Sequence, residues 1–239
     1  MIITIHQPEH LPWLGFFNKL SKAELFVILD HVQFEKNYFQ NRNRIIGTNG
    51  PQWIGIPVIT KGHMDGSIAN TEISLAGGNL KWKEKYLQTI MQSYGKYPYF
   101  SQVYPIIEEV FSQDSMMLCD YNIGIIKKFS QELGFHPEFI RSKDLNVSGL
   151  KSDLILDICK ETKANTYIAG PSGRDYLNMQ SFSDNGIKVV FNDFHHPEYP
   201  QRKTKEFVPY MSSLDLFMNV GFDAGRRIIV EGNELLNDF

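Results

Sequence analysis

The sequence predicts an α/β fold built on a mainly parallel, Rossmann-like sheet, with a helical insertion at about residues 80–134. Short apolar runs rich in Ile, Val and Phe alternate with segments of helical periodicity near both ends of the chain. The middle of the chain instead carries consecutive helical patterns. Parallel strands joined by a helix form right-handed crossovers, so the alternation favours βαβ units.

Length and composition fit one globular domain spanning residues 1–239. Hydrophobic residues make up 42% of the chain and charged residues 21%, which excludes disorder and fibrous folds. The net charge is −3, so there is no global basic field, and nucleic acid is not expected as the main partner.

The first thirty residues predict a strand, a helix and a second strand. Residues 2–6 form a β-rich run, and two prolines separate it from a helical pattern at residues 13–22. Residues 25–29 are continuously apolar, as in a strand buried on both faces, and Asp30 follows them.

The centre of the chain predicts a turn at residues 48–50 and a Gly-containing flexible link at residues 61–70. The other expected elements are strands at residues 53–59 and 71–75 and helices at residues 80–94, 103–111 and 116–133, with Gly134 ending the last helix.

The last hundred residues predict a second α/β segment. Ser152 is expected to cap its first helix, and Ser212 or Ser213 its last. The expected strands are residues 138–141, 166–169 and 188–191, and the expected helices are residues 152–163, 176–183 and 212–220.

The densest polar motif, His6-Gln-Pro-Glu-His10-Leu-Pro-Trp13, follows the first expected strand. Ligands of open α/β sheets bind beyond the carboxyl ends of the strands, where a helix N-terminus also offers free N–H groups. Histidines there can act as acids or bases, or as hydrogen-bond donors to a phosphate. The alternative is that the prolines form a rigid turn and the histidines only cap it. The expected ligand contacts are His6, Gln7, His10 and Trp13.

Asp30 lies beside this loop if the first two strands are neighbours, and we expect it to orient a histidine or hold a substrate group, unless it only caps a turn. The polar segment that follows contains two arginines two residues apart, which share a face in an extended chain. Guanidinium groups match phosphate oxygens with paired hydrogen bonds, although a solvated basic loop is the alternative. The expected contacts are Gln33, Asn41, Arg42 and Arg44.

A glycine-containing loop at residues 170–176 also follows an expected strand. Glycines let the backbone approach a ligand, and consecutive N–H groups can surround an anion, although a plain turn is the alternative. The expected contacts are Gly170, Ser172, Gly173 and Tyr176.

Tyr199 and Gln201 follow the last expected strand and are predicted to hydrogen-bond a polar substrate. The adjacent His195 and His196 point in different directions and lack an evident third ligand, so no metal site is expected. In a parallel sheet these loops converge on one edge, and that convergence predicts a ligand site.

Cys119 and Cys159 lie in expected helices and are predicted to be buried thiols in a reducing compartment. The N-terminus lacks signal-peptide features, and no apolar run reaches about 18 residues. A cytoplasmic protein without a membrane span is therefore expected. The residues identify no cofactor and leave open whether the chain forms a homo-oligomer.

Together the motifs resemble those of the WbqC-like family over almost the whole chain. The family pattern has tyrosine at the position of His10, so the resemblance favours His6 as the catalytic group. The matching segments are His6-Gln-Pro-x-x-Leu-Pro-Trp-Leu-Gly-Phe-Phe17, Leu29-Asp-x-Val-Gln-Phe34, Gln40-Asn-Arg-Asn-Arg-Ile45, Tyr167-Ile-x-Gly-Pro-Ser-Gly-x-x-Tyr176, Tyr199-Pro-Gln201 and Phe207-x-Pro-x-x-Ser212-x-x-Asp-Leu216.

The resemblance implies a role in bacterial surface-polysaccharide biosynthesis, such as that of O-antigen or capsule, in company with enzymes of nucleotide-linked amino sugars. The leading hypothesis is a transferase acting on a nucleotide-activated, amino-bearing sugar. His6 is its expected general base and Asp30 the orienting group. The two arginines are expected to hold the diphosphate, and Ser172 with the N–H groups near Gly173 to stabilise negative charge.

Two alternatives stay open. One is a non-catalytic carbohydrate- or nucleotide-binding partner of polysaccharide enzymes, which the many aromatic and amide side chains also suit. The other is a nucleotidylyltransferase-like enzyme, because the opening of the chain resembles that of enzymes with a His-x-x-His signature. Trp13 replaces the second histidine of that signature, and the comparison is a fold-level analogy.

Overall fold

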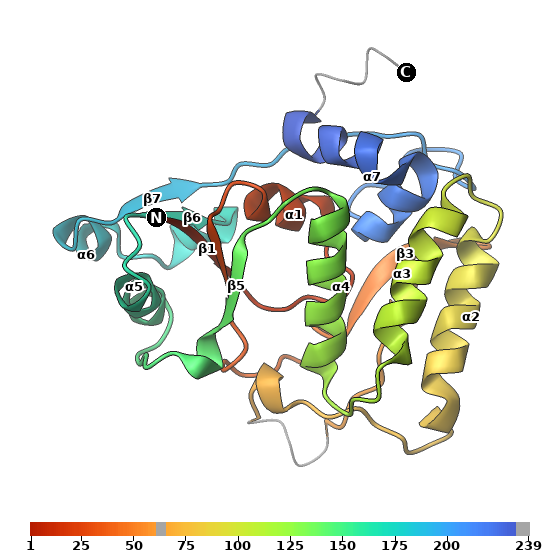
Figure 1. Ribbon diagram of the computed structural model, residues 1–239, viewed down its shortest axis with the longest axis horizontal. Helices are drawn as coiled ribbons and strands as arrows, with labels where there is room; N and C mark the ends of the chain where they lie inside the picture. Colours follow the sequence, from red (N-terminus) through yellow and green to blue (C-terminus); the bar gives the residue numbers. More distant parts are fainter. Residues whose placement is uncertain (61–65, 233–239) are drawn as a thin grey trace.

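The computed structural model describes residues 1–60 and 66–232, which form an α/β fold around a five-stranded sheet (Figure 1). Every neighbouring pair of strands in this sheet is parallel, which confirms the predicted sheet type. The strand order is β5-β2-β1-β6-β7. The strands are β1 (Ile2–His6), β2 (Leu25–Ile28), β5 (Glu138–Arg141), β6 (Thr166–Ala169) and β7 (Lys188–Phe191).

Strand β1 lies at the centre of the sheet because it pairs with β2 on one side and β6 on the other. His6 is in register with Ile28, and the Thr4 hydroxyl donates a hydrogen bond to Ile168 O at 2.9 Å. All four residues of β2 are buried, as expected for an apolar run covered on both faces. The carboxyl end of β1 therefore opens at the middle of the sheet edge.

The chain between β2 and β5 holds the predicted helical insertion and a two-stranded antiparallel hairpin. The hairpin consists of β3 (Arg42–Gly47) and β4 (Gly50–Gly55), and the insertion of α2 (Trp82–Tyr94), α3 (Phe100–Ser112) and α4 (Leu118–Glu132). The remaining α-helices of the described residues are α1 (Leu14–Leu20), α5 (Ser152–Glu161), α6 (Met179–Asp184) and α7 (Ser213–Glu231). Within these residues, no helix is both long and apolar enough to cross a membrane.

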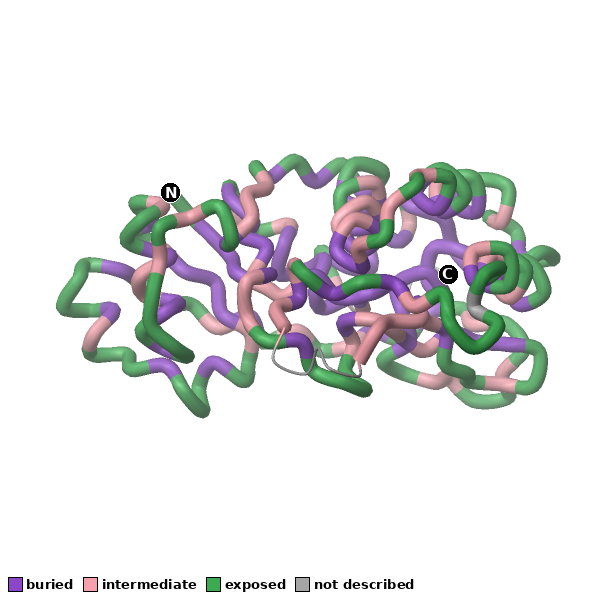
Figure 2. Tube along the Cα trace, turned by 90° about the horizontal axis from the view of Figure 1, so that it is seen from below, coloured by how far each residue is buried: buried purple, intermediate pink, exposed green. Residues whose placement is uncertain are grey.

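The buried apolar side chains form two clusters, and Figure 2 shows the buried segments running inside a rim of exposed turns. The smaller cluster joins one face of the sheet to α5 and α6. The larger cluster joins α1 to the hairpin, the inserted helices and α7. Its centre includes the rings of Phe129 and Phe217, whose centroids are 5.2 Å apart, and Phe17, which contacts both.

Several predicted boundaries are confirmed by backbone geometry. The turn at residues 48–50 closes the hairpin, where Gly50 takes a φ of +105°. Gly134 follows α4 with a φ of +68°, as expected for a helix stop. The Ser212 side chain caps α7 by accepting from Leu214 N at 3.1 Å. The helix expected to end at residue 220 is kinked there by Gly221 and then resumes.

Other predictions are corrected. The strand expected at residues 53–59 ends at Gly55, and that at residues 71–75 is reduced to isolated bridges, because neither finds a longer partner strand. Ser152 does not cap α5, since its hydroxyl accepts from Asn178 N at 2.8 Å and Lys151 takes the cap position.

Two further segments differ in extent. The helix expected from residue 176 begins at Met179, after the 3₁₀ turn Pro171–Asp175. Of the expected link at residues 61–70, the first five residues lie outside the described ranges, and Ile68–Asn70 form a 3₁₀ turn.

The buried carboxylate of Asp215, on α7, is hydrogen-bonded to side chains from other segments of the chain. Asp215 accepts hydrogen bonds from Tyr94 Oη at 3.0 Å, Tyr199 Oη at 2.9 Å and Gln201 Nε2 at 2.8 Å. Tyr94 Oη in turn accepts from Ile46 N at 3.0 Å. Burial raises the pKa of Asp215, while these donors oppose the shift. The carboxylate therefore joins α2, β3, the C-terminal loop and α7.

Asp215→Ala is expected to lower the free energy of unfolding by about 3 kcal/mol, because it leaves buried donors without an acceptor. Urea denaturation of the wild type and the variant measures this loss. Asp223→Ala, which removes an exposed carboxylate from the same helix, is the matched control and is expected to change little. Equal stability of the two variants would contradict the structural role of Asp215.

Candidate functional site

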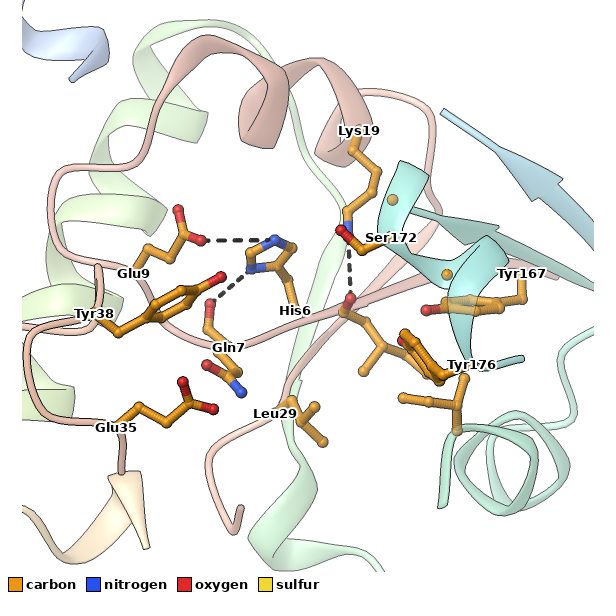
Figure 3. A pocket seen from close by; sticks show the side chains of 14 residues that line it. His6, Gln7, Glu9, Lys19, Leu29, Glu35, Tyr38, Tyr167, Ser172 and Tyr176 are labelled. Atoms are coloured by element: carbon orange, nitrogen blue, oxygen red, sulfur yellow. Dashed lines mark hydrogen bonds and ion pairs between the residues drawn. The ribbon is translucent and has the colours of Figure 1, made fainter. Parts of the chain in front are cut away.

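A cavity of about 330 Å³ opens at the carboxyl ends of β1 and β6 (Figure 3), and we call it the His6 pocket. Its walls come from the loop after β1, from α1, from the segment after β2 and from the glycine-containing loop after β6. The lining residues are Ile5, His6, Gln7, Glu9, Lys19, Leu29, Glu35, Tyr38, Ile155, Tyr167, Gly170, Ser172, Gly173 and Tyr176.

Lys19 enters the pocket from a helix that has no solvent-exposed face. All seven residues of α1 are buried, since the helix packs between the sheet and α7. Only 4% of the Lys19 surface is exposed, and its Nζ donates a hydrogen bond to Ile5 O at 3.1 Å. This hydrogen bond holds the amine near the carboxyl end of β1, next to His6.

His6 is neutral and has a defined tautomer. Its Nδ1 lies 3.0 Å from Gln7 O, and because a carbonyl oxygen only accepts, Nδ1 carries the proton. Nε2 is then free to accept, and it lies 3.9 Å from Glu9 Oε1. Burial and the nearby charge of Lys19 lower the pKa of His6 to about 3. The side chain still keeps 26% of its surface exposed, so a ligand can reach it.

Glu9 and Lys19 are the groups whose protonation changes near neutrality. Burial raises the pKa of Glu9 to about 7, opposed by the charge of Lys19. Burial lowers the pKa of Lys19 to about 7, opposed by Glu9. Figure 3 shows the two side chains approaching the His6 ring from different sides. A general acid or base works best when its pKa is near the working pH, so this pair suits proton transfer.

Sequence reasoning missed both members of this pair as site residues. Glu9 lies within the expected ligand loop, but nothing local indicates that its carboxyl is buried. Lys19 gives no such signal either, because Asn18, Lys19 and Lys22 lie on one side of the helical pattern and look like an ordinary solvent-facing surface.

The glycine-containing loop reaches the pocket as predicted. Gly170, Ser172, Gly173 and Tyr176 all line it. A Cβ on Gly173 would lie 3.0 Å from the Leu177 side chain, so a larger residue in this tightly packed turn would require its neighbours to shift.

Trp13 lies on the other side of His6, at a smaller cavity of about 60 Å³ that also touches Lys19. Its indole stacks on His196 with an interplanar angle of 11° and a centroid distance of 6.3 Å. Gly15 permits this placement, because a Cβ there would lie 2.3 Å from the indole. Trp13 is therefore next to the His6 pocket rather than in its wall.

His10 and Asp30 are held away from His6, contrary to the expected arrangement. His10 is fully buried, with Nδ1 3.0 Å from Asn122 Oδ1 and Nε2 2.8 Å from Tyr86 Oη. Asp30 accepts from Arg141 Nε at 2.5 Å and from Ser142 Oγ at 3.2 Å, so it fixes the end of β5 and does not orient His6. The polar atoms of both side chains are occupied by partners that lie far away in the sequence.

The expected arginine contacts are also separated from the pocket. Gln7, by contrast, lines the His6 pocket, and its side-chain oxygen accepts a hydrogen bond from Gln40 Nε2 at 2.7 Å. Asn41 and Arg42 instead line a groove beside the hairpin, because β3 pairs with β4 and not with the main sheet. Arg44 lines neither cavity.

The remaining expected contacts lie elsewhere. Gln33 pairs with Ser67 in an isolated bridge outside the pocket, and Tyr199 and Gln201 bind Asp215.

In residues 1–60 and 66–232, no group of three or more His, Cys, Asp or Glu side chains is arranged to hold a metal ion. Burial raises the pKa of both Cys119 and Cys159 to about 12, so neither thiol is a ready nucleophile.

Fold and site together define a Rossmann-like α/β protein with a polar pocket at the carboxyl end of its central strand. The WbqC-like protein family matches residues 7–227, and the chain belongs to that family. It is 26% identical over 223 residues to the uncharacterized protein Rv1507c of Mycobacterium tuberculosis, covering 93% of this chain and 95% of that one. No solved structure matches the chain significantly.

Lys19→Met is expected to stabilise the protein at pH 7, by up to about 4 kcal/mol from linkage. The unfolded chain keeps the ordinary lysine pKa of 10.5, whereas the folded value is about 7. Between these values the unfolded state binds more protons, so wild-type stability rises with pH. The stability of Lys19→Met lacks this rise, so its advantage over the wild type shrinks with pH and disappears near pH 10.5.

Urea denaturation at pH 7, 8.5 and 10 measures the difference between wild type and Lys19→Met. Lys160→Met, which removes an exposed lysine from α5, is the matched control and is expected to follow the wild type. The buried-amine assignment fails if Lys19→Met and Lys160→Met show the same pH dependence.

Proposed function

We propose that the protein is a transferase of bacterial surface-polysaccharide biosynthesis that acts on a nucleotide-linked amino sugar, with the sugar in the His6 pocket. The observation that carries the proposal is the Glu9–Lys19 pair, whose protonation changes near neutrality beside a neutral, accessible His6. Membership in the WbqC-like family supports the biological setting.

The chemistry of the pocket suits the sugar better than the diphosphate. Its described walls bring together the carboxyl groups of Glu9 and Glu35 with the hydroxyls of Tyr38, Ser172 and Tyr176. Such groups hydrogen-bond sugar hydroxyls and attract an ammonium group, whereas carboxylates repel phosphate. A volume of about 330 Å³ is at the lower end for small-molecule sites.

The base in this proposal is Lys19 rather than His6. An imidazole with a pKa of about 3 is a weak base, while a Lys19 amine with a pKa of about 7 is half deprotonated at neutrality. As the sugar amine attacks an activated acyl donor, a C–N bond forms, the bond from the acyl carbon to its leaving group breaks, and the amine proton passes to Lys19 Nζ. His6 Nε2 positions the amine by accepting a hydrogen bond.

Lys19→Met is expected to lower kcat at least 100-fold, because removing a general base costs about 10²- to 10⁴-fold. The measurement is mass spectrometry of UDP-, GDP- and dTDP-linked amino sugars incubated with acyl-CoA or acyl-phosphate donors and the protein. Lys160→Met is the control and is expected to keep wild-type turnover.

A mass change that Lys19→Met also supports at the wild-type rate would refute the assigned base. If the wild type binds these sugars in a thermal-shift assay but changes none of them, the protein is a binding partner and the transferase proposal falls.

A further inference from the structure

A second cavity lies between the hairpin and α2. Its volume is about 430 Å³, larger than that of the His6 pocket. Arg42 and Trp53 contribute from the hairpin, and Lys85 and Tyr86 from α2. We call it the hairpin groove.

The charges in the hairpin groove have one sign. Among the described residues that line it, the charged side chains are Arg42 and Lys85, and no carboxylate accompanies them. The His6 pocket, by contrast, is lined by Glu9 and Glu35 as well as Lys19. The groove therefore attracts an anion that the His6 pocket does not favour.

Arg42 has unused hydrogen-bonding capacity. Its Nη2 donates to Asn37 O at 2.7 Å, which anchors the guanidinium, but its buried Nε has no partner within the described residues. A buried donor without a partner costs free energy. The Arg42 side chain also lines the groove, and phosphate oxygens match the guanidinium fork.

The same groove offers flat apolar surfaces. Trp53 is 50% exposed, and the Arg42 guanidinium lies 4.3 Å from its ring centroid. Pro57 adds apolar surface beside it, whereas Trp82 and Tyr86 are buried beneath the groove and pack on Phe111. Exposed aromatic and guanidinium planes stack on nucleobases.

From this combination we infer that the hairpin groove binds a nucleoside phosphate, with the base against the exposed ring of Trp53 and the phosphate between Arg42 and Lys85. The net charge of −3 disfavours a longer nucleic acid, which leaves a single nucleotide as the occupant. The inference stands apart from the chemistry of the His6 pocket and does not require it.

The test is a titration of the full chain with UMP, dTMP and GMP, followed by tryptophan fluorescence, because Trp53 lies in the groove. The corresponding nucleosides, which lack the phosphate, are expected to bind at least 10-fold more weakly. Arg42→Gln and Lys85→Gln are each expected to weaken nucleotide binding at least 10-fold.

Arg44→Gln is the matched control, since it removes the same charge from the same strand but outside the groove, and it is expected to bind as the wild type does. Lys19→Met is also expected to bind normally, which separates this site from the His6 pocket. Lys85→Gln changes an exposed side chain and decides the result if Arg42→Gln fails to fold.

The inference is overturned if nucleotides bind no better than nucleosides, if Arg44→Gln weakens binding as much as Arg42→Gln, or if Lys19→Met abolishes binding. No binding of any nucleotide at millimolar concentration would overturn it equally.

Discussion

The pairing of β1 on both sides is the constraint on which the site depends. Because β1 is hydrogen-bonded to β2 on one side and to β6 on the other, it is the central strand, and its carboxyl end lies at the middle of the sheet edge. The chain then crosses to β2 through α1, a helix so short and so fully enclosed that Lys19 must lie inside the protein. The Lys19 amine donates a hydrogen bond to Ile5 O near the end of β1. This contact places a buried amine beside His6 and Glu9.

The buried polar groups of this protein fall into two kinds. His10 and Asp215 have their polar atoms occupied by several hydrogen bonds, and they connect distant segments. Lys19 donates one hydrogen bond, to Ile5 O, and Glu9 lies 3.9 Å from His6 Nε2 and within the influence of the Lys19 charge. Such incomplete pairing destabilises the fold. Proteins retain groups of this kind where binding or catalysis requires them.

Sequence patterns predicted the fold well, because apolar runs and helical periodicity are local properties. They also placed Gln7 and the glycine-containing loop in the pocket with His6. They did not show that His10 and Asp30 lie away from His6, because their partners Asn122 and Arg141 are more than a hundred residues away in sequence. They did not show that Arg42 lines a different groove from that of His6, because the pairing of β3 with β4 depends on tertiary contacts.

The most direct measurement is the titration of Lys19 itself, by NMR of the protein labelled with ¹³C-lysine, with Lys19→Arg used to assign the resonance. A buried amine beside Glu9 and His6 predicts a midpoint near pH 7 for its Cε shift, while the exposed lysines titrate near their ordinary value of 10.5. A Lys19 midpoint indistinguishable from that of the exposed lysines would contradict the assignment of this pocket as a site of proton transfer.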